Sequence, residues 1–123
     1  MRTKIFRLAV VAAGTAAVLV APATSFANHT VVKATARDTW NDSYNHVVPG
    51  TRVVWKNPAR LNDTHDVTAY GRNWDRQVTL RPGESTAKRF RNTGTYKYRC
   101  RIHSQLNNGE CEGMCGVIHV ARY

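Results

Sequence analysis

Short segments rich in β-branched and aromatic residues, separated by turn dipeptides, are the feature that most limits how this chain can fold. No long stretch has apolar residues at helical spacing, and Pro-Gly and Thr-Gly dipeptides divide the chain. The segments expected to be strands are 31–36, 51–56, 64–70, 76–80, 84–91, 95–100 and 117–122. About seven short strands at near-regular spacing are typical of an antiparallel sandwich or barrel. The sequence therefore predicts an all-β fold, an antiparallel β-sandwich.

Two longer segments lack this strand pattern. Residues 37–45 are polar apart from Trp40 and Tyr44, and we expect a loop with a short helical turn there. Residues 104–113 separate two expected strands and contain Cys111 and several glycines and asparagines. We expect this second segment to be a loop as well.

The first 27 residues have the composition of a secretory signal peptide. Residues 1–7 carry three cations and no acid, residues 8–21 are apolar or small, and Ser25-Phe26-Ala27 places small residues where a signal peptidase reads them. The apolar run is short for a bilayer span, which needs roughly 20 residues. We therefore expect cleavage after Ala27 and a single domain over 28–123. The mature protein would be secreted to the periplasm or cell envelope and would have no membrane span.

The mature chain is strongly basic. The leader holds three of the 18 Lys and Arg residues, which leaves 15 against 8 Asp and Glu, a net charge of +7. These charges are spread along the chain, which favours a soluble monomer and an acidic partner protein or an anionic cell-envelope surface. Nucleic acid is not expected as a partner, because the sequence has neither a recognition helix nor an aromatic-plus-basic RNA-binding motif.

Three cysteines are an odd number for an exported protein, so we expect one disulfide and one unpaired thiol with a separate function. Cys111 and Cys115 are close enough in sequence to form a disulfide across a tight loop. Strand alternation places Cys100 on the same face as Tyr96 and Tyr98, pointing into the core. We expect a Cys111–Cys115 disulfide and a Cys100 thiolate held by a metal.

His65 and His103 are the imidazoles expected to join Cys100. A strand end followed by a tight turn can bring Cys100 and His103 to one point, because two residues separate them. His65 lies on an expected strand face with apolar neighbours, so it points inward too. Met114, in a glycine-flanked segment, is the expected weak fourth ligand. One Cys, two His and a distant Met form the ligand set of an electron-transfer copper site.

Five segments carry motifs that extend this pattern over most of the chain. They are Val-Pro-Gly-Thr-Arg-Val-Val-Trp-Lys-Asn at 48–57, Thr-His-Asp-Val at 64–67, Arg-Pro-Gly-Glu at 81–84, Gly-Thr-Tyr-Lys-Tyr-Arg-Cys-Arg-Ile-His at 94–103 and Gly-Met-Cys-Gly-Val-Ile at 113–118. The set resembles the cupredoxin family, the type 1 blue copper proteins such as plastocyanin and azurin. The resemblance implies a Greek-key β-sandwich and one-electron transfer. It also implies one type 1 copper per chain, held by His65, Cys100 and His103, with Met114 as the axial ligand.

The sequence departs from the family in two places. Ten residues separate His103 from Met114, where family members usually have four. We expect a disulfide-braced insertion there, with Gln105 as the alternative axial ligand. Asp66 stands where the family often has Asn or Thr, and its backbone N–H is expected to reach the Cys100 sulfur.

We expect electrons to leave through His103, which lies at the solvent end of its segment. Arg101 and Ile102 flank His103 and are expected to form part of the docking face. A cationic rim there would steer an acidic redox partner and make association depend on salt.

Other functions stay open at this point. Cys100, His103, Cys111 and Cys115 could form a structural zinc site. An exported copper carrier or buffer would use the same ligands without electron transfer. A copper enzyme is not expected, because His46 and His119 show no metal-ligand spacing to each other and no catalytic residues stand out.

Overall fold

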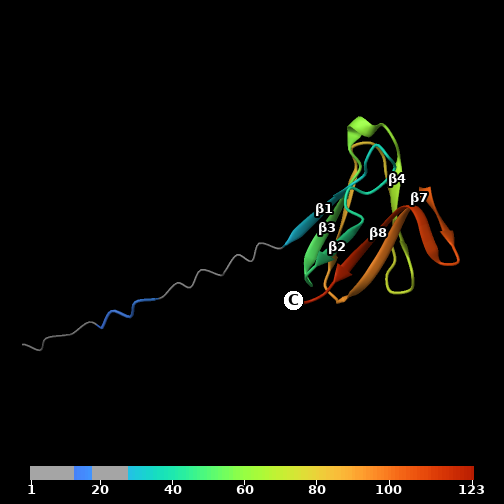
Figure 1. Cartoon of the computed structure of the whole chain (residues 1–123). Coiled ribbons are helices and arrows are strands. Elements are labelled where there is room, and N and C mark those ends of the chain that lie inside the picture. The colour runs from blue at the N-terminus through green and yellow to red at the C-terminus, as the bar shows by residue number, and fades with distance from the viewer. Residues whose placement is uncertain (1–12, 18–27) are drawn as a thin grey trace, which may run out of the picture.

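The computed structural model describes residues 13–17 and 28–123, so the predicted signal peptide and its cleavage site lie largely outside the described residues. Figure 1 shows a small β domain, and the described residues also include a short 3-10 helix. The elements are β1 (His29–Lys33), β2 (Tyr44–Val47), β3 (Thr51–Lys56), η1 (Ala59–Leu61), β4 (His65–Tyr70), β5 (Gln77–Leu80), β6 (Ser85–Phe90), β7 (Gly94–Asn107) and β8 (Glu110–Val120). Within the described part of the chain, no helix has the length and hydrophobicity that crossing a bilayer requires.

The strands form two sheets, in the orders β1-β3-β6 and β2-β8-β7-β4-β5. The all-β sandwich prediction is confirmed, and its topology is consistent with a Greek key. The sheets are mixed, however, because β1 pairs with β3 and β2 pairs with β8 in parallel. The sequence did not indicate β2, since it is only four residues long and two of them are polar.

Aromatic residues from both sheets fill the core. Trp55 of the smaller sheet and Tyr98 of the larger are fully buried, and their rings meet edge to face at 5.3 Å between centroids. Trp40, in the segment expected to be a loop, is also buried and packs on Tyr98 at 5.7 Å. In β7, burial alternates as predicted, and Cys100 points inward with the tyrosines.

The prediction of a loop over 104–113 is wrong, because β7 and β8 continue as one long hairpin through this segment (Figure 1). Asn107 pairs with Glu110 around a two-residue turn, Asn108-Gly109, in which both residues have positive φ. Asn-Gly is the preferred sequence for this kind of turn, because both positions require left-handed backbone. The Cys111–Cys115 disulfide lies within β8, at 6.1 Å between Cα atoms.

An irregularity in the hairpin creates the site. Arg99 pairs with Cys115 and Ser104 pairs with Gly113, so the register shifts between these two pairs. Four residues of β7, 100–103, therefore lie opposite one residue of β8, Met114. A bulge of this kind bends the strand and redirects its side chains. It turns both Cys100 and His103 toward the start of β4.

Candidate metal centre

The structure brings His65, Cys100 and His103 together. His65 begins β4, while Cys100 and His103 come from the bulge in β7. The Nδ1 atoms of the two imidazoles are 3.1 Å apart. The Sγ atom of Cys100 lies 3.6 Å from Nδ1 of His103 and 3.9 Å from Nδ1 of His65. Three donor atoms of the soft and borderline kind therefore converge on one point.

The size of this triangle fits a metal ion. The point in the plane of the three atoms that is equally distant from all of them lies about 2.1 Å from each. This distance matches the usual metal–imidazole bond length of about 2.0–2.1 Å and is slightly shorter than the usual metal–thiolate bond length of about 2.3 Å. A trigonal set of two imidazoles and one thiolate is typical of blue copper sites. The donor set fits one copper ion.

Burial shifts the pKa values of the two inner residues of the cluster. His65 and Cys100 are fully buried. Burial lowers the pKa of His65, and the neighbouring His103 imidazole lowers it further. Burial raises the pKa of the Cys100 thiol, although the Asp66 N–H opposes this effect. The lowered pKa favours the neutral, metal-binding form of the His65 imidazole, while metal binding must displace the Cys100 thiol proton.

Asp66 connects the two segments that carry His65, Cys100 and His103. Its backbone N–H donates to Sγ of Cys100 at 3.4 Å, as expected from the sequence. Its buried carboxylate accepts the Arg101 backbone N–H at 3.0 Å and the Arg101 Nε–H at 3.2 Å. The Thr68 hydroxyl donates to the same carboxylate at 2.9 Å. Asp66 thus ties β4 to β7 on both sides of the ligand cluster.

Two carboxylates that the sequence did not indicate lie at the outer edge of the cluster. Nε2 of His103 is 3.4 Å from Oδ2 of Asp63 and 3.6 Å from Oδ1 of Asp38. A carboxylate beside the second ring nitrogen orients a metal-ligating histidine. Asp63 follows η1 and Asp38 lies in the turn after β1, so only the tertiary fold brings them together. No spacing in the sequence could have shown this.

The predicted fourth ligand, Met114, lies in β8 and not in a glycine-flanked loop. Its side chain is fully buried, and it is the residue of β8 opposite the bulge that carries Cys100 and His103. Gln105, the alternative, is exposed, and its amide donates to Glu112 at 3.4 Å. Burial and register therefore favour Met114 over Gln105 as the residue nearest the cluster.

The remaining predicted residues are placed as follows. Cys111 and Cys115 are joined to each other, which removes both from the alternative zinc site. Ile102 is exposed beside His103, at 55% of its full surface. Arg101 is also exposed and forms an ion pair with Asp66 at 3.2 Å. The immediate surroundings of His103 are therefore more acidic than the predicted cationic rim.

No known family model matches the sequence, and no curated protein matches it. Solved structures do match the fold. A methionine-to-glutamine mutant of amicyanin in the Cu(I) form is 21% identical, with a TM-score of 0.59 over 76% of this chain and 83% of that chain. A purple cupredoxin from Nitrosopumilus maritimus is 18% identical, with a TM-score of 0.54 over 74% of this chain and 98% of that one.

A copper-containing nitrite reductase from Thermus scotoductus is also similar, at 20% identity and a TM-score of 0.57. The match covers 76% of this chain but only 22% of the reductase, so it concerns one part of a longer protein. At these identities the likeness establishes architecture. The chain therefore has the cupredoxin fold that its sequence motifs predict.

Proposed function

We propose that this protein is secreted, holds one type 1 copper ion and carries single electrons between redox partners. The observation that carries the proposal is the triangle of His65 Nδ1, His103 Nδ1 and Cys100 Sγ, which has the size of a three-coordinate metal site. The copper ion supplies a one-electron couple between Cu(I) and Cu(II). Rigid strands hold the three ligands, so their donor atoms move little when the charge changes. Met114 is proposed as the weak axial ligand.

We place the electron route at His103. Its side chain is 20% exposed, while His65 and Cys100 are fully buried, so it links the cluster to the surface. Ile102 supplies an apolar contact beside it, and Arg101 contributes to the docking face. The charge of +7 over 28–123 favours an acidic redox partner protein or an anionic cell-envelope surface. The protein acts as a monomer and catalyses no reaction of its own.

Repeated reduction and oxidation of the copper-loaded protein tests this function. Ascorbate and ferricyanide are suitable reagents, and copper content is measured after each cycle. We expect a reversible couple, full retention of copper, and fast electron exchange between oxidised and reduced molecules, seen as NMR line broadening. Release of copper on reduction, or slow exchange, would instead indicate a copper carrier with the same ligands.

A further inference from the structure

Two histidines outside the metal centre lie side by side on the outer face of the larger sheet. His46 is in β2 and His119 is in β8, and the parallel pairing of these strands places them directly opposite each other. Their ring centroids are 5.3 Å apart, with an angle of 52° between the ring planes. The absence of metal-ligand spacing between them in the sequence was therefore misleading, because pairing of β2 with β8 joins residues from distant parts of the chain.

The geometry of this pair is close to that of the two histidines in the metal centre. The rings of His65 and His103 have centroids 4.8 Å apart and planes at 54°. Two imidazoles that share one metal through bonds of about 2.0–2.1 Å have their centroids about 5 Å apart. The ring separation of His46 and His119 is therefore compatible with a shared metal ion.

The surroundings leave both rings available to a metal. His46 is exposed and His119 is partly exposed. The hydroxyl of Thr95 lies 3.1 Å from Nδ1 of His119, which holds that ring and leaves Nε2 open. Among the described residues, neither histidine forms an ion pair with a carboxylate. A ligating histidine held through its second nitrogen is the usual arrangement in metal sites.

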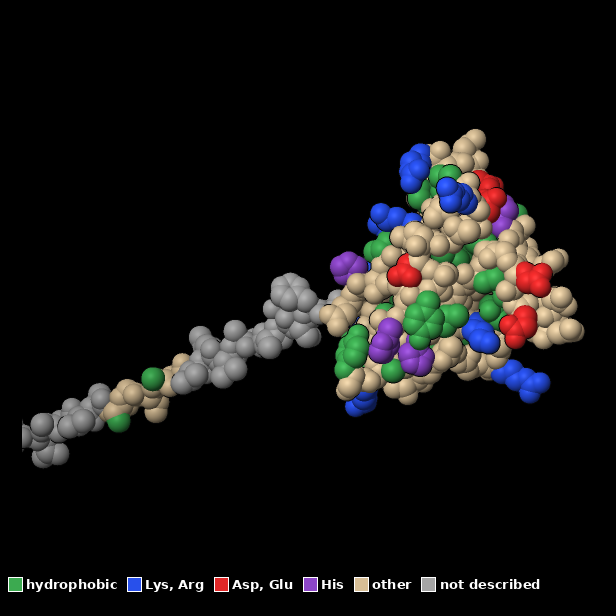
Figure 2. Space-filling view, in the orientation of Figure 1, with side chains coloured by type: hydrophobic (Ala, Val, Ile, Leu, Met, Phe, Trp, Pro, Cys, Tyr) green, Lys and Arg blue, Asp and Glu red, His purple; other side chains and the backbone are tan. Residues whose placement is uncertain are grey.

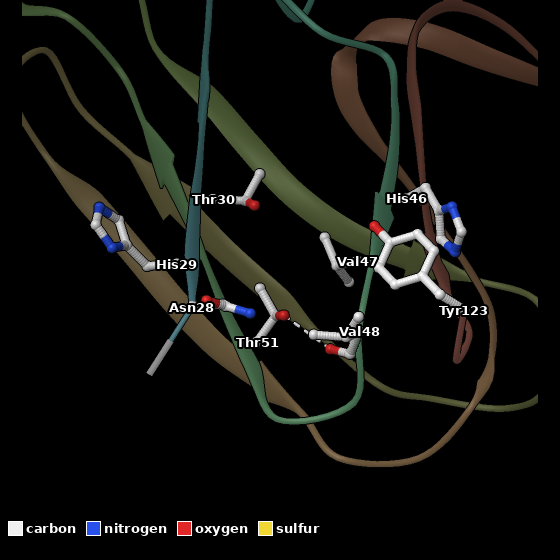
Figure 3. Close-up of a pocket in the computed structure, with 8 residues that line it drawn as sticks. All are labelled: Asn28, His29, Thr30, His46, Val47, Val48, Thr51 and Tyr123. Carbon is white, nitrogen blue, oxygen red and sulfur yellow. Dashed lines mark hydrogen bonds between the residues drawn. The ribbon is translucent and has the colours of Figure 1, made fainter. Parts of the chain in front are cut away.

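Aromatic rings border the pair and limit its movement. Tyr44 stacks on His119 at 6.3 Å between centroids, and Tyr123 lies 4.9 Å from His46. Figure 2 shows two histidine side chains next to each other among apolar side chains, over the ends of β2 and β8. Figure 3 shows His46 beside Tyr123 on one side of a hollow, with His29 on the opposite side.

We infer that His46 and His119 form a second, surface site for a borderline divalent ion, Cu(II) or Zn(II). Imidazole suits both ions, and at a given site Cu(II) binds more tightly than Zn(II). Water fills the remaining coordination positions, so the ion is exchangeable. The site is independent of the buried centre, because His119 is five residues along β8 from Met114, about 17 Å of extended strand.

Titration of Zn(II) into the oxidised, copper-loaded protein tests this site by calorimetry, with the buried centre already filled. We expect one zinc ion per chain. The variants His46→Gln and His119→Gln should each weaken zinc binding by about tenfold or more, because loss of even an outer partner of a metal site costs about 10- to 100-fold. Added Cu(II) should give a second, tetragonal EPR spectrum that both variants lose.

Two control variants make the outcome decisive. His29→Gln removes the histidine on the opposite side of the hollow from His46, and this variant should bind zinc as the parent does. The double variant Asp38→Asn, Asp63→Asn removes the carboxylates beside His103 and should also leave zinc binding unchanged. Parent-like binding in His46→Gln, or loss of binding in either control, would overturn the inference. A parent protein that does not turn blue with copper would count against the proposed function alone.

Discussion

Asp66 links His65, the first proposed metal ligand, to Cys100 and His103, the other two. It follows His65 directly, its N–H contacts the Cys100 sulfur, and its carboxylate binds the backbone and side chain of Arg101. An uncharged amide could accept the same backbone hydrogen bond, so the charge is not needed for that contact. The buried negative charge instead stabilises whichever state of the site is more positive, which is Cu(II).

The variant Asp66→Asn is therefore expected to raise the reduction potential of the copper by some tens of millivolts, for a couple in which about 59 mV is a tenfold change. It should retain copper and the blue colour. Cyclic voltammetry measures the change, with the exposed Asp75→Asn as the control for a charge lost elsewhere. An equal shift in both variants would show that Asp66 acts only through the total charge.

Met114 allows a second prediction about the effect of a single side chain on the reduction potential. The variant Met114→Gln replaces a soft thioether with a harder oxygen donor, which favours Cu(II), so the potential should fall while copper is retained. Met114→Leu removes the donor and should raise the potential. Opposite shifts by voltammetry would support an axial role for Met114. Shifts of the same sign would mean that Met114 only fills the core.

Among the elements, the β7–β8 hairpin does most to form the site. Its bulge directs Cys100 and His103 to one side, and Gly113 allows the facing strand to come close. Gly113 has a φ of 102°, and a Cβ there would collide with the carbonyl oxygen of His103. Gly109 in the turn also has positive φ, at 79°, but has open space around it.

This difference makes the two glycines a matched pair. Gly109→Ala should lower the free energy of unfolding by about 1–2 kcal/mol, because left-handed backbone is unfavourable for alanine by about that amount. Gly113→Ala should lower the free energy of unfolding by more than Gly109→Ala does. It should also alter the EPR spectrum of bound copper, because His103 must move. Urea unfolding and EPR measure the two effects. An unaltered spectrum in Gly113→Ala would mean that the close contact does not position His103.

The strands around the site also show how much of the structure could be predicted from the sequence. Alternation in β7 was sufficient to predict that Cys100 points inward, because strand period depends on local sequence. The Asn108-Gly109 dipeptide is typical of a two-residue hairpin turn, but the prediction of an insertion loop over 104–113 did not use it. Strand β2 and the approach of Asp38 and Asp63 to His103 were not predictable, since they arise from pairing between distant segments.

Over the whole molecule, the net positive charge and the local negative charge around His103 have opposite effects on an approaching anion. The chain over 28–123 has a net charge of +7, which attracts anions from a distance. At His103, however, Asp38 and Asp63 place two carboxylates next to the exposed imidazole. The proposed acidic partner is therefore attracted by the overall charge but meets local repulsion at the proposed electron route.

Oxidation of the reduced protein by ferricyanide, an anion, should consequently slow as salt is added, because salt screens the overall attraction. The double variant Asp38→Asn, Asp63→Asn should react faster with ferricyanide and more slowly with the cationic tris(phenanthroline)cobalt(III). Stopped-flow absorbance measures both rates. Equal changes with the two oxidants would place the electron route away from His103.

The visible spectrum of the copper-loaded protein, recorded beside that of the Cys100→Ser variant, tests most directly whether His65, Cys100 and His103 hold copper. We predict an intense blue thiolate-to-copper band with one copper per chain in the parent protein. The variant, which lacks the thiolate, should have no such band and should bind copper far more weakly. A colourless copper-loaded parent, or a variant that keeps the band, would contradict this account.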